Sequence, residues 1–282
     1  MSGIPNELNQ AESSDSTVTP NLKRMIKSTR SLMLSLLSVG VFVLVWIMMT
    51  SSGSISPIFL PPPSAVLSES HKLLASGELW KAVGASSMRV FAGFALAAVV
   101  AIPAGILMGI FWPLRAIGAP FISLLRPLPS IAWVPLTMLW MGIGESQKIA
   151  IVFLGSWIYI MLATLESTKQ VDPILIRAAR NLGASDFALM HEVIFPGALP
   201  GIIAGMKMTL AISWACVLSA ELVAAHSGLG ALIWNAKEWG NLPLVIVGMI
   251  CISVVVLVVD VLAAQAEKRL LPWLRNSDHK GN

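Results

Sequence analysis

The sequence predicts an all-α integral membrane protein with six transmembrane helices, and two observations lead to this fold class. The first is composition: 56% of the 282 residues are hydrophobic, 12% are charged and the mean hydropathy is +0.78, whereas soluble domains carry about 25% charged residues. The second is a set of six apolar runs, each long enough to cross a bilayer as a helix. The expected spans are residues 32–49, 90–112, 121–141, 149–165, 202–223 and 244–264.

The chain before the first span is polar. Residues 1–21 are rich in Ser, Asn and Pro and show no apolar periodicity, so residues 1–31 are predicted to form a disordered cytoplasmic tail. The first apolar run is longer than the roughly 7–15 residues of a signal-peptide core and follows a long polar segment. An uncleaved first span is therefore favoured, with a cleaved signal peptide as the alternative because small residues follow at 50–53.

The next elements contain many prolines. Consecutive prolines in ISPIFLPPP (55–63) exclude a helix there, and residues 64–81 are predicted to form an amphipathic surface helix. Pro103 is expected to kink the second span. The third span contains Arg126 together with three prolines. Because irregular backbone at membrane depth needs cover from protein or from a water-filled cavity, this span is expected to face the interior of the bundle.

The basic residues predict the orientation in the membrane. Six spans place both termini on one side, and the segments of that side carry 14 of the 19 Lys and Arg residues. The other side carries the remaining five, which are Lys72, Lys81, Arg89, Lys148 and Lys237. Cytoplasmic segments are enriched in Lys and Arg. Both termini, the C-terminal tail 274–282 and the loop 172–200 are therefore predicted to be cytoplasmic.

Several function classes find no support in the residues. A net charge of +4 is modest and does not indicate nucleic-acid binding. Both cysteines lie in apolar runs and the four histidines are scattered, so neither a disulfide framework nor a metal site is predicted. The sequence has no G-x-x-x-x-G-K-[ST] phosphate loop and no residues spaced like a catalytic site. Energy for any driven process must therefore come from a partner or from an ion gradient.

The loop 172–200 is the one long segment that predicts two short helices joined by a glycine. Asp172 can cap the first helix, Gly183 can supply a left-handed residue after its end, and Ser185 can cap the second. Pro196 and Pro200 are expected to stop that second helix. The apolar face of the first helix comprises Ile174, Leu175, Ala178, Ala179 and Leu182. An ordinary cytoplasmic loop between two spans is the alternative interpretation.

The run RAARNLGASDFALMHEVIFP (177–196) resembles the EAA loop of the permease subunits of binding-protein-dependent ABC importers. The family pattern is Glu-Ala-Ala, three residues, Gly, nine residues, Ile, any residue, Leu, Pro. Ala178, Ala179, Gly183 and Pro196 match it, whereas Arg177, Val193 and Phe195 replace the Glu, Ile and Leu. In that family the loop is a coupling helix that docks into a cleft on the ATPase subunit. A contact that relies on a carboxylate at position 177 is not carried over to this chain.

The resemblance extends over most of the chain after about residue 55. The stretches at 125–155, 220–234 and 267–273 resemble the nitrate/sulfonate/taurine subgroup of these permeases, and they occur in the expected order. The resemblance implies one permease domain at 32–273 that transports a small organic anion. An aliphatic sulfonate or taurine is favoured, and nitrate or another oxyanion is the alternative.

The resemblance also implies the assembly. The chain would be a homodimer in the bacterial inner membrane, in contact with lipid, with two ATPase subunits on the cytoplasmic face and a periplasmic substrate-binding protein outside. It would catalyse no reaction and bind no cofactor, because ATP and Mg²⁺ would be held by the partner ATPase. The coupling-loop residues are expected to be Arg177, Ala178, Ala179, Gly183, Val193, Phe195 and Pro196.

Polar residues at membrane depth are candidates for the translocation path or a gate. Arg126 could attract an anionic substrate or extend to lipid phosphates. Glu221 matches the acidic residue of the family's Ala-Glu pair and is expected to serve in a gate pairing or at a helix end. Ser213 and Trp214 could face the cavity, although packing is the commoner role of Trp. An ion-coupled secondary carrier or a membrane-embedded enzyme would need buried acids or a polar catalytic cluster, which the sequence does not indicate.

Overall fold

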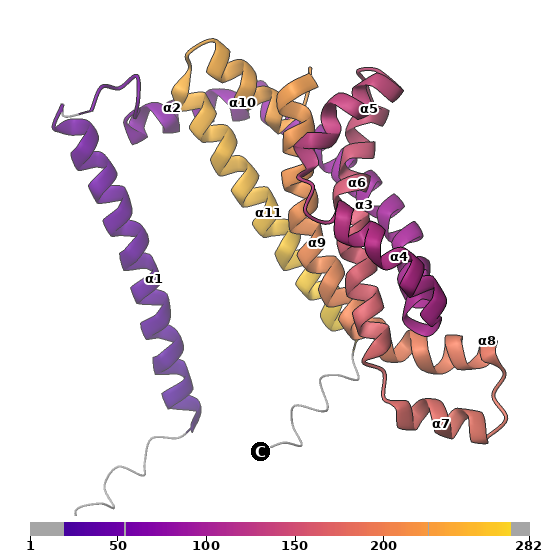
Figure 1. Cartoon of the computed structure of the whole chain (residues 1–282). Helices are drawn as coiled ribbons and strands as arrows, with labels where there is room; N and C mark the ends of the chain where they lie inside the picture. The colour runs from indigo at the N-terminus through magenta and orange to yellow at the C-terminus, as the bar shows by residue number, and fades with distance from the viewer. Residues whose placement is uncertain (1–19, 54, 225, 272–282) are drawn as a thin grey trace, which may run out of the picture. The chain divides into compact units, whose positions relative to one another are not determined.

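The computed structural model describes residues 20–53, 55–224 and 226–271, and these residues form helices and turns without a strand (Figure 1). They divide into two compact units, 1–65 and 66–282, which are described separately. The prediction of an all-α chain is confirmed for the described residues. The predicted tail at 274–282 and residues 1–19 of the predicted N-terminal tail lie outside them.

The first unit is built around helix α1 (Pro20–Ser51), which contains the predicted first span. Residues 20–31, the last part of the predicted tail, lie in this helix. Proline favours the first position of a helix, and the Lys and Arg residues that follow are good helix formers. Residues 55–62 are not helical, as the prolines predicted, whereas Pro63, which was predicted to be non-helical too, begins the next helix. The indole Nε1 of Trp46 donates to the carbonyl of Pro61 at 3.1 Å and so ties this segment to α1.

The predicted surface helix at 64–81 is two elements. Helix α2 (Pro63–Ser76) ends at Gly77, whose φ of +73° is a conformation that glycine adopts at little cost. Helix α3 (Glu78–Ile110) then begins and runs through the predicted second span and past Pro103 without a break. Residues 78–81 therefore belong to the second span and not to the surface helix.

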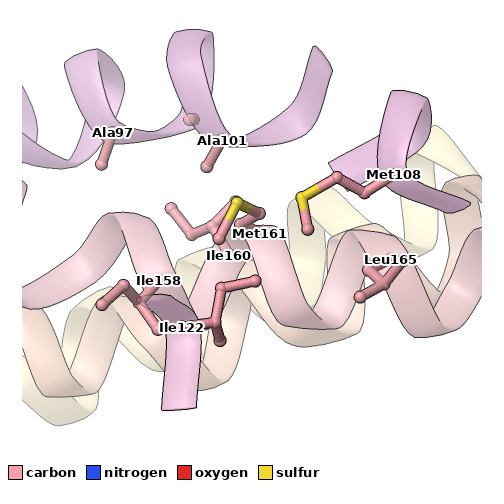
Figure 2. Packing of buried hydrophobic residues seen from close by; sticks show 9 residues of the cluster. Ala97, Ala101, Met108, Ile122, Ile158, Ile160, Met161 and Leu165 are labelled. Atoms are coloured by element: carbon pink, nitrogen blue, oxygen red, sulfur yellow. The ribbon is translucent and has the colours of Figure 1, made fainter. Parts of the chain in front are cut away.

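The core of the second unit is formed by α3, α6 (Glu145–Lys169) and α9 (Phe195–Ala224). Glycines on α3 allow α6 to approach closely: a Cβ atom at Gly93 would lie within 3 Å of Val152, one at Gly105 within 3 Å of Thr164, and one at Gly109 within 3 Å of Thr168. Because the residue numbers rise together in both helices, α3 and α6 run parallel. Figure 2 shows the apolar core that α3 and α6 form together with Ile122 of the following helix; it includes Ala97, Ala101, Met108, Ile122, Ile158, Ile160, Met161 and Leu165.

The predicted third span at 121–141 is not a single helix. Helix α4 (Trp112–Leu125) is followed by the 3₁₀ turn η1 (Ser130–Trp133) and helix α5 (Val134–Met141), and the two halves are bent by 94°. Pro127 and Pro129 have no N–H to continue the helix, and Pro129 is extended with ψ of 145°. The expected burial is found in part: Ile122, Val134 and Thr137 are buried, whereas Phe121, Leu124, Leu139 and Trp140 are exposed.

The last elements are the short helix α10 (Leu229–Glu238) and the long helix α11 (Leu242–Leu270), most of which is exposed and apolar. Helix α3, helix α6, the stretch Asp186–Val223 and helix α11 are long and apolar enough to span a membrane, and α4 with η1 and α5 forms a bent pair. The spans predicted at 90–112, 149–165, 202–223 and 244–264 correspond to these four stretches. In Figure 1, α5 and α10 lie at one end of the second unit, and helices α7 and α8 lie at the other.

Candidate functional site

The first candidate site is the helical hairpin that connects α6 to α9. Its first arm is α7 (Pro173–Asn181), and the Asp172 carboxylate accepts the N–H of Ile174 at 2.8 Å as the predicted cap. Gly183 has φ of +83°, its N–H donates to the carbonyl of Arg180, and the N–H of Ala184 donates to the carbonyl of Ala179. This pair of bonds is a Schellman motif, which ends a helix through a left-handed residue. The chain reversal is therefore encoded locally.

The apolar side of this hairpin is exposed. None of the residues of α7 is buried. Leu182 is 88% exposed and Phe187 is 77% exposed, and Ile174 and Leu175 are also exposed. Exposed apolar patches next to polar residues mark interaction surfaces in soluble parts of proteins. The exposed side chains of Ile174, Leu175, Leu182 and Phe187 are named here the docking face.

The charged residues of the hairpin are peripheral to the docking face. Arg177, which stands where the EAA pattern has Glu, is exposed, and its Nε donates to the carbonyl of Pro173 at 3.3 Å. Arg180 and Asp186 are 3.7 Å apart across Gly183, but both side chains are mostly exposed. Exposed pairs of this kind contribute about 0–1 kcal/mol. The Schellman motif, and not the ion pair, therefore determines the angle between the arms.

The second arm of the hairpin continues directly into the membrane-spanning helix. Ser185 caps α8 (Asp186–Ala188) by accepting the N–H of Ala188, as predicted. The chain then makes a π-helical turn, η2 (Leu189–Ile194), and enters α9. The expectation that Pro196 and Pro200 stop this helix is therefore wrong. At the junction the N–H of Phe195 donates five residues back to Met190, so the hydrogen-bond register changes where the proline lacks its own N–H.

The remaining coupling-loop residues differ in burial. Ala178 and Pro196 are exposed, and Phe195 is 37% exposed. Ala179 and Val193 are half-buried. Leu189 and Ile194 of the π-helical turn are buried, so they hold the second arm against the rest of the unit. The hairpin thus presents one apolar side outward while its base is packed.

The second candidate site is a buried ion cluster at the opposite end of the unit. All five N–H donors of the Arg89 guanidinium are satisfied. Nε and Nη2 donate to the two oxygens of Glu145 at 2.6 and 2.7 Å. Nη1 donates to Glu221 at 2.5 Å and to the carbonyl of Ser227, and Nη2 also donates to the Ser227 hydroxyl. Arg89 is buried in α3, so its charge depends on these partners.

The Glu221 carboxylate is buried at the centre of the cluster. Besides Arg89, it accepts the hydroxyl of Ser86 at 2.8 and 2.9 Å and the N–H of Gly230 at 2.8 Å. Gly230 lies in the first turn of α10, where the helix dipole also favours a negative charge. A Cβ atom at Gly228 or at Gly230 would collide with Glu221. The carboxylate therefore fixes the start of α10 against the end of α9.

The cluster joins four helices with balanced charge. Lys148 is buried on α6 and donates to Glu145 at 3.0 Å. Two cations, Arg89 and Lys148, thus face two carboxylates, Glu145 and Glu221, of which Glu145 is partly open to solvent. Its members come from α3, α6 and α9, and Glu221 also accepts the N–H of Gly230 at the start of α10. We name Ser86, Arg89, Glu145, Lys148 and Glu221 the ion cluster.

Sequence reasoning found one member of the ion cluster. Glu221 was a candidate for a gate pairing or a helix end, and in the structure it pairs with Arg89 and accepts the N–H of Gly230 at the start of α10. Arg89 and Lys148 were assigned to the outer side, and their burial was not predicted. The available signal was that Arg89 directly precedes the charge-free run beginning at Val90. Its partner at position 221 is too distant in the sequence to be inferred from local pattern.

The other path candidates lie apart from the ion cluster. Ser213 is buried and pairs with the hydroxyl of Ser156 on α6 at 2.8 Å, so it joins two core helices. Trp214 is buried, and its Nε1 has no hydrogen-bond partner among the described residues. Arg126 is exposed at the break between α4 and η1, where its carbonyl accepts the hydroxyl of Tyr159 at 3.5 Å. The structure therefore brings none of these three residues together with Glu221.

The fold and these sites define a polytopic helical membrane protein with an exposed apolar hairpin at one end of the second unit and a buried ion cluster at the other. The chain belongs to the family of binding-protein-dependent transport system inner membrane components, which matches residues 101–272. It is therefore an inner-membrane permease subunit of an ABC importer in the nitrate/sulfonate/taurine group. The family accounts for a transport role rather than catalysis.

Named relatives cover most of the chain. The taurine transport system permease protein TauC of Escherichia coli is 35% identical over 87% of this chain and 91% of its own length. The putative aliphatic sulfonates transport permease protein SsuC of the same organism is 36% identical over 84% and 90%. The bicarbonate transport system permease protein CmpB of Synechococcus elongatus is 28% identical over 90% and 92%.

Solved structures confirm the fold. A chain of the MetNI methionine ABC transporter in an inward-facing conformation superposes with a TM-score of 0.59, at 21% identity, over 68% of this chain and 94% of that chain. At this identity the likeness supports the architecture of the membrane helices and says nothing of the substrate.

Proposed function

We propose that this chain is the permease subunit for a small organic anion, an aliphatic sulfonate or taurine, and that its hairpin couples it to an ATPase. The observation that carries the coupling is the docking face: a rigid two-armed element with apolar side chains exposed at one end of the bundle. Two ATPase subunits would hold ATP and Mg²⁺ and contact this face. The sulfonate assignment is supported by relatives named for taurine and for aliphatic sulfonates.

Coupling would operate by population shift between two states of the bundle. The Schellman motif at Gly183 and the buried base of the second arm make the hairpin stiff, so movement of a docked ATPase would reach α9 with little loss. Small residues at Ala178 and Ala179 allow close approach of a partner. The Arg177 side chain would meet a partner surface that differs from the one that an EAA glutamate contacts.

A second copy of this chain would cover the broken third span. Its backbone bends by 94° at a depth where lipid cannot supply hydrogen bonds, and several of its side chains are exposed in the single chain. A permease homodimer that places α4 and α5 along a shared central path would meet both requirements. A periplasmic binding protein would deliver substrate at the end that carries α10.

The basic residues support cytoplasmic termini in six-span topology. Of the five Lys and Arg residues assigned to the outer side, Arg89 and Lys148 belong to the ion cluster, where both pair with Glu145. Lys72, Lys81 and Lys237 lie outside the ion cluster, and Lys72 pairs with Glu69 at 2.7 Å. The count of 14 Lys and Arg residues against five supports cytoplasmic termini.

The two alternatives make different demands. In the first alternative, the assembly is the same and the substrate is nitrate or another oxyanion. The relative named for bicarbonate transport is the observation behind this alternative. An ion-coupled secondary carrier needs a membrane-buried acid that can bind a proton or a cation. The buried acid of this chain, Glu221, is paired with Arg89 and hydrogen-bonded by Ser86, which favours a fixed structural role.

The test is uptake by proteoliposomes that contain the chain, its ATPase and its binding protein. We expect ATP-dependent uptake of taurine or of an alkanesulfonate, and no uptake when ATP is replaced by an ion gradient. Uptake of nitrate alone would keep the importer and overturn the sulfonate assignment. Uptake driven by a gradient without the ATPase would overturn the importer. Growth of a deletion strain on single sulfonates as sulfur source, against growth on sulfate, provides the control in the cell.

A further inference from the structure

A groove of about 400 Å³ lies between α3, α4 and α6, and two arginines line it. Arg115 and Arg126 contribute the charge, and the walls are largely apolar, with Met108, Ile122, Leu162 and Leu165. No acidic residue lines the groove. Within the described parts of the chain, neither guanidinium makes a hydrogen bond or an ion pair. An arginine inside a membrane protein normally has such a partner.

The two arginines lie at different depths. Gly109 near the end of α3 packs against Thr168 near the end of α6, so the start of α4, with Arg115, lies at the end of the unit that leads to α7. The carbonyl of Arg126 accepts the hydroxyl of Tyr159, ten residues before the end of α6. At a rise of 1.5 Å per residue, ten residues of α6 correspond to about 15 Å. Arg126 therefore lies about 15 Å from the end of α6 at Lys169.

The separation argues against a bound phospholipid. A lipid with its phosphate at Arg115 would lay an acyl chain along the groove to Arg126, and would bring hydrocarbon against an unpaired guanidinium. A small anion can occupy one arginine and then the other. Its charged group would be held by a guanidinium while a short aliphatic body contacts the apolar wall between them.

We propose that Arg115 and Arg126 are two successive anion-binding positions on the cytoplasmic half of the translocation path, and that the apolar wall between them selects anions with a short aliphatic body. The proposal rests on the proposed function and narrows it. It assigns a role to Arg115, explains why the groove carries cations without acids, and places the substrate preference on the wall residues Met108, Ile122, Leu162 and Leu165.

The groove can be tested without transport. Ser123 lines the groove, and in a chain with Cys216→Ser and Cys251→Ser it is replaced by cysteine. The thiolate is then modified by 2-sulfonatoethyl methanethiosulfonate, an anion, or by the trimethylammonium analogue, a cation; each forms a disulfide and releases methanesulfinate. We expect the anionic reagent to be favoured, and the ratio of the two rates to fall about tenfold in Arg115→Gln/Arg126→Gln. Arg→Lys variants should keep the ratio.

A matched control is Ser253→Cys on α11, which is exposed and does not line the groove. Its rate ratio should not respond to the arginine substitutions. A ratio at Ser123→Cys that is equally insensitive would overturn the proposal, because the guanidinia would then not set the potential of the groove. This result is independent of whether the importer is active.

Transport provides the second arm. In proteoliposomes, Arg126→Gln and Arg115→Gln should each lower the maximal rate of sulfonate uptake at least tenfold while the binding protein keeps its affinity, and Leu162→Gln should reduce discrimination between an alkanesulfonate and nitrate. Full activity of both arginine variants would refute the two positions. If wild type transports none of the tested anions, the proposed function fails, and the thiol rates still decide whether the groove binds anions.

Discussion

Replacing Glu221 by Gln removes the most buried charge of the ion cluster and keeps its shape. Glu221 accepts from Arg89, Ser86 and Gly230, and a glutamine offers one oxygen and one N–H₂ group in place of two oxygens. Whichever way the amide turns, its N–H₂ meets a donor, either the guanidinium or the N–H of Gly230. The substitution therefore leaves an uncompensated positive charge and an unsatisfied donor in a buried site.

The expected destabilisation is about 3 kcal/mol. Breaking a buried pair by removing one partner costs about 3–5 kcal/mol, and the lower end applies because Arg89 keeps two bonds to Glu145. A loss of that size changes the folding equilibrium by about two orders of magnitude. Glu145→Gln is the matched control: its side chain is 54% exposed, so water can replace part of the interaction. We expect about 1 kcal/mol for that variant.

The assay is equilibrium unfolding of the purified chain in mixed micelles, followed by helical circular dichroism. Adding Arg89→Met to Glu221→Gln removes both charges and leaves Glu145 with Lys148, which restores neutrality. The double variant should therefore be more stable than the sum of the two single losses predicts, by about 2 kcal/mol. Equal stability of Glu221→Gln and Glu145→Gln, together with strict additivity in the double variant, would refute the ion cluster.

Three further predictions concern glycines and topology. Gly183→Val replaces a residue with φ of +83° by a β-branched one. The protein should insert normally, while ATP hydrolysis continues without uptake. Normal uptake by a well-expressed variant would count against the docking face. Gly105→Ala places a Cβ atom 2.7 Å from Thr164 and should destabilise the bundle by about 1–3 kcal/mol in the same unfolding assay. The control is Gly84→Ala, where the new Cβ atom has no neighbour within 4 Å; this variant should be neutral or slightly stabilising. A reporter fused after Gly240 should lie outside the cytoplasm, and a cytoplasmic reporter there would contradict the six-span orientation.

The hairpin was predictable because its signals are local. Asp172, Gly183 and Ser185 each act on backbone groups within five residues, and the structure shows all three in the expected conformations. The continuation of the helix through Pro196 and Pro200 was not predictable in the same way. A proline normally ends a helix, but a π-helical turn absorbed the change of register here, and that choice depends on how Leu189 and Ile194 pack.

The ion cluster shows the opposite case. Arg89 lies 132 residues from Glu221, and the pairing exists only because α3 and α9 are neighbours in the bundle. No sequence window contains both residues, so the charge count by segment assigned Arg89 to the outer side and gave it no partner. The broken third span falls between these cases: its prolines predicted irregular backbone but not the size of the bend, which is 94°.

The helical stretch Asp186–Val223 begins in the hairpin and contains Glu221 near its other end. Its 38 residues make a rod about 57 Å long at 1.5 Å per residue. A tilt of about 5° at one end of such a rod displaces the other end by about 5 Å, which exceeds the length of any bond in the ion cluster. The two ends of the second unit are thus joined by one continuous helical stretch. The π-helical turn near the start of this stretch sets its stiffness.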